Sequence, residues 1–347
     1  MNQNGIVNVE DHMDRYGSAR ARWALALLIA LLTLVASCAS GPAAQEDAGP
    51  TREFQADNGT VTIPVQPKRV IAIGYAVPTL LEAGTPLVGI SDFARALPFL
   101  TPEQRKTYDS LPRVAGDTNT DINYEAIAAL KPDLIVLGVP KVAVGGVALD
   151  QLTPTAPVVA IGPLVPSDWR NYSRQQADAA ASLAGFDAAR TAYEARAAEL
   201  RTKYQRVLPG LKFGHVGSYG QIAQGTFQRE YANSGGTNIA QDIGVNYYGQ
   251  VREPGPGARA VSEYTSLEEL VPSLGQADAI TYSVNPDGSV PDPVKQVLDT
   301  PLWATLPGVK AKRTFPLRLT EATTYGGARA TLDAIDTSLA PLLKAPR

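Results

Sequence analysis

Short, continuous apolar runs recur along the first half of the chain. They lie at residues 69–74 (RVIAIG), 86–91 (PLVGIS), 133–139 (DLIVLGV) and 157–161 (PVVAI). A strand that is apolar on both faces is typical of a parallel sheet covered by helices. Stretches with helical spacing, such as 77–83 and 125–130, separate these runs. The pattern predicts a parallel α/β layer over residues 58–166.

The second half of the chain repeats this alternation. Strand-like runs lie at 212–217, 278–284 and 313–319, and helical stretches include 293–304 and 326–343. A second α/β layer is therefore expected over residues 187–347. The length of 347 residues also favours two lobes, because it exceeds what a single hydrophobic core usually holds.

A helical segment separates the two layers. Ser167 and Asp168 can cap a helix that runs to Gly185, where a glycine is a common stop signal. This predicts a backbone helix over residues 167–186, followed by a second helix that starts at Asp187. The expected fold is α/β, with two Rossmann-like lobes joined by a single long backbone helix.

One segment of the first half has a counterpart in the second half. Residues 123–133 and 266–278 each begin with a helix-capping residue, Asn123 or Ser266, and have a glutamate two positions later. An apolar stripe follows, and then an aspartate at the start of a buried strand. We call these two segments the quasi-repeat, and they predict that the lobes share one plan.

The first residues carry a processing signal rather than part of the fold. A basic segment precedes an apolar run over 23–35, which is too short to span a bilayer, since that requires roughly 20 apolar residues. Residues 35–38 (VASC) resemble a bacterial lipobox. We expect a lipoprotein signal peptide over 1–37, lipidation of Cys38, and a flexible tether over 38–57. The protein would then be anchored by lipid on the extracytoplasmic face of the cell membrane; a buried free thiol at Cys38 is the alternative.

Composition excludes several kinds of site. Cys38 is the one cysteine of the chain, which leaves no disulfide or thiolate cluster. The formal charge of −3 offers no basic field for nucleic acid. Of the two histidines, His12 lies in the signal segment, so no histidine cage can hold bare zinc or manganese. His215 remains open as a direct iron ligand, a haem ligand or a packed strand residue.

Several motifs follow one another in the order found in a known class of transport proteins. They are 67–71 (PKRVI), 87–90 (LVGI), Gly116 followed by 123–125 (NYE), 130–135 (LKPDLI), 234–236 (SGG), and Trp303 with 306–307 (LP) and 309–311 (VKA). Over about residues 58–343 the chain resembles the helical-backbone (class III) solute-binding proteins of ABC importers. Its last hundred residues are similar to the hydroxamate-siderophore, or ferrichrome-type, receptors.

The resemblance implies a lipid-anchored binding component that captures a ferric siderophore and delivers it to a permease. It implies no enzymatic activity and no cofactor, the Fe³⁺ chelate being the ligand. A hydrolase using Ser218 and His215 is disfavoured, because the Gly-x-Ser-x-Gly elbow is missing. The alternatives are a haem- or cobalamin-binding protein of the same fold, and an envelope protein of this fold that binds a protein or a cell-wall component.

Candidate ligand-binding residues follow the predicted strands. Parallel α/β sheets bind ligands beyond the carboxyl ends of their strands, so two facing lobes would form one cleft. Guanidinium groups bind pairs of chelate oxygens, and aromatic rings lie against an organic scaffold. The candidates are Tyr75, Arg95, Lys141, Tyr219, Arg229, Arg252, Tyr282 and Tyr325. A solvated arginine or a core tyrosine is the alternative at each; for Tyr325, the resemblance implies a place beside the iron chelate.

Two glutamates match docking positions of the same class. The resemblance implies that Glu125 and Glu268, one in each half of the quasi-repeat, contact arginine pockets on the two subunits of an ABC permease dimer. Both positions also suit glutamates that stabilise a helix N-terminus. The binding protein itself is expected to be a monomer.

Overall fold

The computed structural model describes residues 49–117 and 121–344. The predicted signal peptide, Cys38 and the tether up to residue 48 lie outside the described residues. The described residues form one compact unit from Pro50 onward. Across these residues, no helix combines the length and the apolar character needed to cross a membrane.

The first lobe is built on a five-stranded parallel sheet with the order β5-β4-β3-β6-β7. Its strands are β3 Val70–Gly74, β4 Leu87–Ser91, β5 Arg113–Ala115, β6 Leu134–Gly138 and β7 Val158–Ala160. Its helices are α2 Ala76–Glu82, η1 Ala94–Phe99, α3 Pro102–Ser110, α4 Tyr124–Ala129, η2 Lys141–Gly146 and α5 Leu149–Leu152. Every residue of β3 and β6 is buried, as the continuous apolar runs predict.

A hairpin of β1 Thr51–Ala56 and β2 Gly59–Pro64 precedes this sheet. The prediction of a flexible tether up to residue 57 is therefore wrong over its last part. Phe54 is buried in the core, and Arg52 forms an ion pair of 2.9 Å with Asp178. Pairing with β2 and these two contacts hold the segment in place.

The second lobe has a mixed sheet with the order β10-β9-β8-β11-β12. The strands are β8 Phe213–Gly217, β9 Thr226–Glu230, β10 Ser262–Ser266, β11 Ala279–Ser283 and β12 Thr314–Leu317. β8, β11 and β12 are parallel, whereas β9 and β10 pair antiparallel at one edge. The helices of this lobe before α12 are α8 Asn238–Gln241, η4 Gly257–Ala260, η5 Leu267–Glu269, α9 Leu270–Leu274, α10 Asp292–Leu298, η6 Trp303–Thr305 and α11 Pro307–Lys310.

The helix predicted over 167–186 ends early, and the second helix, predicted to start at Asp187, already begins at Leu183. After the turn η3 Pro166–Asp168, α6 covers Trp169–Ala179 and the long helix α7 covers Leu183–Tyr204. The break falls at Ala181, whose φ is 53°, and Gly185 lies inside α7. A Cβ at Gly185 would clash with the carbonyl group of Ala83, so this glycine permits close packing rather than a helix stop.

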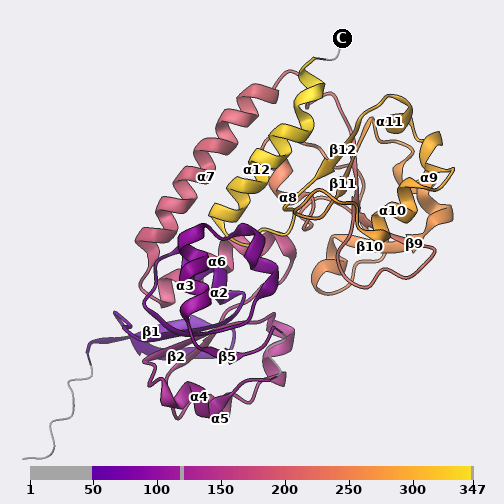
Figure 1. Cartoon of the computed structure of the whole chain (residues 1–347). Helices are drawn as coiled ribbons and strands as arrows, with labels where there is room; N and C mark the ends of the chain where they lie inside the picture. The colour runs from indigo at the N-terminus through magenta and orange to yellow at the C-terminus, as the bar shows by residue number, and fades with distance from the viewer. Residues whose placement is uncertain (1–48, 118–120, 345–347) are drawn as a thin grey trace, which may run out of the picture. The chain divides into compact units, whose positions relative to one another are not determined.

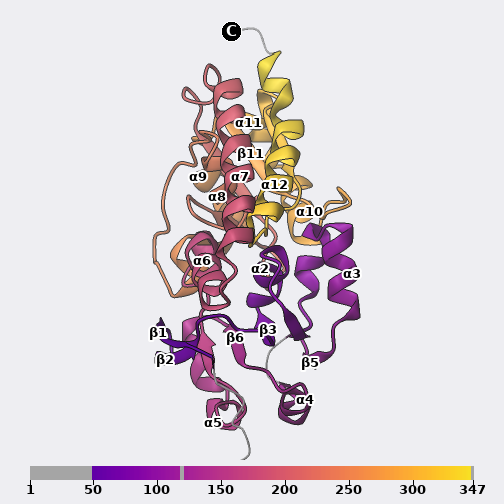
Figure 2. The ribbon, with the colours of Figure 1, turned by 90° about the vertical axis from the view of Figure 1, so that its left-hand side faces the viewer.

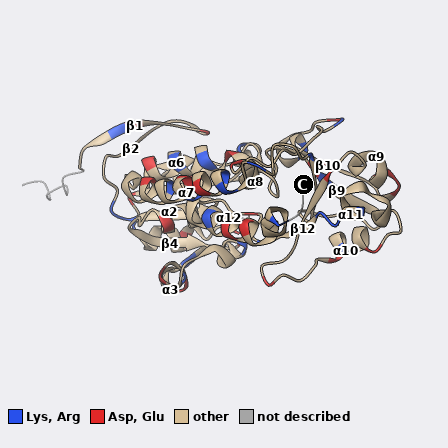
Figure 3. Cartoon of the chain, turned by 90° about the horizontal axis from the view of Figure 1, so that it is seen from above, with Lys and Arg blue, Asp and Glu red and all other residues tan. Residues whose placement is uncertain are grey.

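The long helix α7 lies side by side with α12 Tyr325–Leu339, which ends in the turn η7 Ala340–Leu343 (Figures 1 and 2). Arg196 and Lys203 of α7 pair with Asp336 of α12, at 3.0 Å and 2.6 Å. In Figure 3, blue Lys and Arg positions and red Asp and Glu positions both occur along these helices. The predicted fold class is confirmed: two α/β lobes are connected by a long helical segment.

The quasi-repeat has the predicted local structure in both lobes. Asn123 and Ser266 each accept a hydrogen bond from a backbone N–H of the helical turn that follows. Asp133 accepts from the backbone N–H groups of residues 68 and 69, and Asp278 accepts from that of Lys212. Each aspartate thus fixes the start of a buried strand.

Candidate functional site

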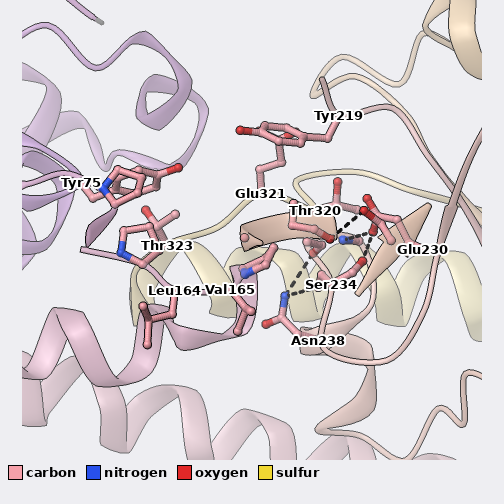
Figure 4. A pocket seen from close by; sticks show the side chains of 18 of the residues that line it. Tyr75, Leu164, Val165, Tyr219, Glu230, Ser234, Asn238, Thr320, Glu321 and Thr323 are labelled. Carbon is pink, nitrogen blue, oxygen red and sulfur yellow. Dashed lines mark hydrogen bonds between the residues drawn. The ribbon is translucent and has the colours of Figure 1, made fainter. Parts of the chain in front are cut away.

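A cavity of about 440 Å³ lies between the two lobes. Segments that follow β3, β4, β6 and β7 line it from the first lobe. Segments that follow β8 and β12, and Ser283 at the end of β11, line it from the second. The carboxyl ends of parallel strands therefore face one cavity, as expected for sheets of this kind. Figure 4 shows lining side chains from both lobes.

Arg95 is the central cation of the first-lobe wall. Its guanidinium group lies 4.6 Å from the centre of the Tyr75 ring, 5.0 Å from that of Phe93 and 6.0 Å from that of Tyr219. It also donates a hydrogen bond to the Tyr75 hydroxyl. Tyr219 belongs to the second lobe, so this cation contacts aromatic rings on both sides of the cavity.

The mouth of the cavity carries exposed side chains. Tyr219 is 40% exposed, and Val142 and Leu164 are exposed on the opposite lobe. Lys141 lines the cavity and reaches Asp57 at 3.8 Å, with most of its side chain in solvent. Of the predicted ligand-binding residues, the structure brings together Tyr75, Arg95, Lys141 and Tyr219.

The second-lobe wall contains two glutamates that sequence reasoning missed. Oε2 of Glu230, at the end of β9, accepts hydrogen bonds from the Ser234 hydroxyl and from the Gly236 N–H at 2.6 Å. Glu321 lies in the segment after β12, within range of the Arg95 charge. Burial raises the pKa of both carboxyl groups. The one sequence signal for Glu321 is the polar segment 320–324 directly after a strand-like run.

The glycines of the Ser-Gly-Gly motif allow this wall to form. A Cβ at Gly236 would overlap Nε2 of His215 and lie 2.7 Å from Oε2 of Glu230. At Gly235, by contrast, a Cβ would meet nothing within 4 Å. The motif therefore brings the backbone close to the buried carboxyl group of Glu230. Of its two glycines, Gly236 is required for this close approach and Gly235 is not.

His215 is a packed strand residue. It is fully buried on β8, and its Nδ1 and Nε2 lie 2.7 Å and 3.1 Å from the hydroxyls of Thr281 and Ser283. Burial, with help from the Arg229 cation, lowers the pKa of His215 to about 3, so the ring is neutral and does not form an ion pair with Glu230 at 3.9 Å. Both ring nitrogens are occupied, which argues against its role as an iron or haem ligand. The described residues contain no cluster of three or more histidine, cysteine or acidic side chains suited to a metal ion.

Arg229 and Tyr282 do not line the cavity, because successive side chains of a strand point to opposite faces of the sheet. Arg229 precedes Glu230 on β9 and is buried on the other face, where its guanidinium group donates to backbone carbonyls and lies 4.6 Å from the Tyr231 ring. Tyr282 precedes the cavity residue Ser283 on β11, and its ring packs against Trp303. The prediction that both residues face the cleft is wrong.

Arg252 and Tyr325 also lie outside the cavity lining. Arg252 is exposed and lies 3.6 Å from Glu263 and 3.5 Å from Glu269. Tyr325 is the first residue of α12, and its ring packs edge-on against Trp169 at 4.8 Å and Phe186 at 5.3 Å. The ring therefore packs against α6 and α7, outside the cavity lining. The resemblance implied a position beside the iron chelate, and this prediction is corrected.

The two glutamates of the quasi-repeat are exposed. Glu125 and Glu268 each follow their capping residue at the start of a helical turn. Neither has an ion-pair partner among residues 49–117 and 121–344. Both carboxylates are accessible to another molecule.

Three known proteins can be compared with this chain. A putative ABC transporter substrate-binding lipoprotein, YhfQ of Bacillus subtilis, is 31% identical over 139 residues, which is 40% of this chain and 41% of YhfQ. The iron(3+)-hydroxamate-binding protein YxeB of the same organism is 30% identical over 142 residues, or 39% of each chain. No family model matches the chain. The matched segments thus span about two fifths of these curated relatives.

The fold extends over a larger part of a solved structure. The siderophore periplasmic binding protein from the fuscachelin gene cluster of Thermobifida fusca has a TM-score of 0.63 and 26% identity. The match covers 81% of this chain and 98% of that one. The homologues are transport proteins that bind substrates and are not enzymes, in agreement with the prediction.

Proposed function

Because the homologues of this chain are ABC transporter substrate-binding proteins and its fold is that of siderophore-binding proteins, we propose that it binds a ferric siderophore and delivers it to an ABC permease. The observation that carries the proposal is the cavity between the lobes, with Arg95 surrounded by tyrosine rings. Its volume of about 440 Å³ lies within the ordinary range for small-molecule sites.

The chemistry around Arg95 suits a chelate rather than a bare ion. The iron of a ferric siderophore is already saturated with oxygen ligands, so recognition acts on the outer oxygens and on the organic scaffold. Arg95 can donate to those oxygens, while Tyr75 and Tyr219 offer rings and hydroxyls beside it. The ligand proposed is therefore the complete Fe³⁺ chelate, with no cofactor and no iron bond to the protein.

Isothermal titration calorimetry tests this function. The purified protein would be titrated with a ferric hydroxamate, a ferric carboxylate and a ferric catecholate siderophore, and with haem and cobalamin. We expect at least one ferric siderophore to bind with a dissociation constant on the order of micromolar or lower, as a ligand of this size in a preformed cavity allows. Tighter binding of haem or cobalamin, or no binding at all, would contradict the proposal.

Variants of the first-lobe wall sharpen the test. Arg95→Ala removes a charged donor from the cavity and should weaken siderophore binding by about tenfold or more. Arg105→Ala is the matched control, because Arg105 lies on α3 and pairs with Asp109, outside the cavity lining. Equal effects of the two substitutions would remove Arg95 from the site.

Delivery and anchoring extend the proposal to residues beyond the cavity. We assign lipidation to Cys38, which would hold the protein on the extracytoplasmic face of the membrane. Glu125 and Glu268 are assigned to the permease dimer, on the basis of their exposure and their matching positions in the quasi-repeat. Incorporation of labelled palmitate that persists in Cys38→Ala would contradict the first assignment.

A further inference from the structure

The second-lobe wall of the cavity is acidic in a way that the proposed function leaves unexplained. Glu230 and Glu321 both line the cavity, and after burial and local hydrogen bonds the negative charge of Glu321 further raises the pKa of the Glu230 carboxyl group. In Figure 4, Glu230, Ser234 and Asn238 lie on the side away from Tyr75, and Glu321 lies between Tyr75 and this group in this view. Two carboxyl groups therefore share one part of the cavity.

Neither carboxylate has a cationic partner within the described part of the chain. His215 is neutral, and the Arg229 guanidinium next in sequence to Glu230 is directed to backbone carbonyls on the other face of β9. Arg95 attracts Glu321 but forms no ion pair with it at 4.0 Å or less. Oε2 of Glu230 has two hydrogen bonds, whereas Oε1 has none from a described residue.

The first-lobe side of the cavity also has a buried polar group without a short hydrogen bond. The hydroxyl of Tyr172, a residue 2% exposed that lines the cavity, has no hydrogen-bond partner among the described side chains and backbone groups. Buried polar groups in folded proteins are almost always satisfied by protein, by water or by a ligand. The Tyr172 hydroxyl lies beside Thr323, another lining residue, so the polar groups of this wall are close to one another without a short hydrogen bond between them.

The missing partner can be specified from these acceptors. A buried carboxylate without a partner is costly, and a charge-assisted hydrogen bond from an N–H donor offsets that cost. A polyanionic ligand would increase the repulsion, whereas an ammonium or guanidinium group would remove it. Since Glu230 and Glu321 line the same cavity, a ligand that fills it meets both carboxyl groups.

We propose that Glu230 and Glu321 form a subsite for a primary ammonium or guanidinium group of the ligand. This inference rests on the proposed function and narrows it: the preferred chelate is a neutral ferric core, such as a ferric tris-hydroxamate, that bears a cationic side group. Ferric tris-catecholates, which carry several negative charges, are disfavoured. The Arg95 wall contacts the chelate oxygens and the acidic wall contacts the cationic group.

A pair of probes that differ in one charge tests the subsite. Ferric desferal has a linear tris-hydroxamate core and a terminal primary ammonium group. Its N-acetyl derivative keeps the same core but has a neutral amide in place of the ammonium. Both would be titrated into the wild-type protein by calorimetry, at one pH and one ionic strength, because salt screens such pairs. We expect the ammonium form to bind about ten- to a hundredfold more tightly.

Substitution of the acidic wall should remove this preference. In Glu321→Gln the ratio of the two affinities should fall toward one, mainly because the ammonium form binds less well. Glu230→Gln should act in the same direction, and Glu321→Gln keeps the test valid if the buried Glu230 proves necessary for folding. Glu103→Gln, an exposed glutamate on α3, is the matched control and should keep the full ratio.

The outcomes separate the subsite from the function. Equal affinity of the wild type for both probes contradicts the subsite and leaves siderophore binding intact. A preference that survives in both glutamine variants also contradicts the subsite. If neither probe binds and the siderophores of the wider panel also fail, the proposed function is wrong and the subsite fails with it. Tighter binding of a ferric catecholate than of ferric desferal overturns the charge argument alone.

Discussion

The carboxylate of Glu82, at the end of α2 in the first lobe, accepts a hydrogen bond of 2.7 Å from the backbone N–H of Gly326 in the first turn of α12. Its second oxygen accepts from the N–H of Tyr325 at 3.0 Å. An N-terminal helix turn has free N–H groups and a partial positive charge, so a carboxylate is a fitting partner. This contact ties α12 to the first lobe.

Replacing Glu82 should destabilise the fold. Glu82→Ala leaves two buried N–H groups without an acceptor and should lower the free energy of unfolding by about 1–3 kcal/mol. Urea denaturation followed by circular dichroism measures the change. Glu82→Gln retains one acceptor oxygen and should lose less. Glu194→Ala, an exposed position on α7, is the control, and a loss there as large as in Glu82→Ala would contradict the capping role.

Asp336 should make stability depend on pH. Burial disfavours its ionised form, but hydrogen bonds from Lys203, Tyr204 and Arg196 outweigh burial and hold the pKa of this carboxyl below its usual value. A lowered pKa in the folded state adds stability at neutral pH, and that stability is lost as pH falls through the folded-state pKa. Asp336→Asn should therefore lower the free energy of unfolding by about 1–3 kcal/mol at neutral pH.

The measurement compares urea midpoints of wild type and Asp336→Asn at neutral pH and near pH 3, below the usual pKa of about 3.9 for aspartate. The difference between their urea midpoints should be smaller at pH 3 than at neutral pH. Asp333→Asn provides the control, because Asp333 is 59% exposed and pairs with Arg196 alone. If the difference between the two urea midpoints is the same at both pH values, Asp336 does not contribute to the pH dependence of stability.

Two neighbouring glycines should respond differently to alanine. The added Cβ of Gly236→Ala would overlap buried His215 and press on Glu230, and overpacking of this kind costs about 1–3 kcal/mol. Gly235→Ala meets open space, so its thermal unfolding should match the wild type. Differential scanning calorimetry of the two variants makes the comparison. Similar melting temperatures for both variants would show that His215 and Glu230 can shift to accommodate the added Cβ.

The double variant Glu125→Ala with Glu268→Ala should separate binding from transport. Both residues lie outside the cavity lining, so siderophore affinity should stay within about twofold, which is below the effect of one lost hydrogen bond. Uptake of siderophore-bound radiolabelled iron by cells should fall to background, because the contacts with the permease are lost. Cells carrying Glu103→Ala with Glu194→Ala are the control. Normal uptake by the Glu125 and Glu268 double variant would remove both residues from docking.

The sequence predicted the strands that are buried by helices on both faces. β3, β6, β8 and β11 are buried on both faces and can be recognised as apolar runs. β9 was missed because Gln228, Arg229 and Glu230 are buried polar residues. Their partners include residues from other segments, among them Ser262 and Ser234, which no local pattern indicates. Gly185 was wrongly predicted to end a helix for the same reason. A glycine is required there by close packing against Ala83, a residue distant in sequence.

The candidate site was predicted well on the first-lobe wall and, on the second-lobe wall, only at Tyr219. Tyr75, Arg95 and Lys141 could be chosen because they follow strands of a regular parallel sheet, whose carboxyl ends meet at one edge. The other wall depends on which residues of β9 and β11 face inward, and antiparallel pairing at the edge of that sheet is not visible in the sequence. Tyr325 was misplaced since its ring follows the packing of α12 against α6 and α7.

Trp169 gives the protein an internal optical reporter of occupancy. Its indole N–H donates a hydrogen bond of 3.0 Å to the side-chain oxygen of Asn238, which lines the cavity. The chain has three tryptophans, and of the two in the described residues Trp303 packs in a separate core cluster of the second lobe. A ligand that contacts Asn238 will alter the polarity around one fully buried indole, so cavity filling can be followed by the wavelength of tryptophan emission without any added label.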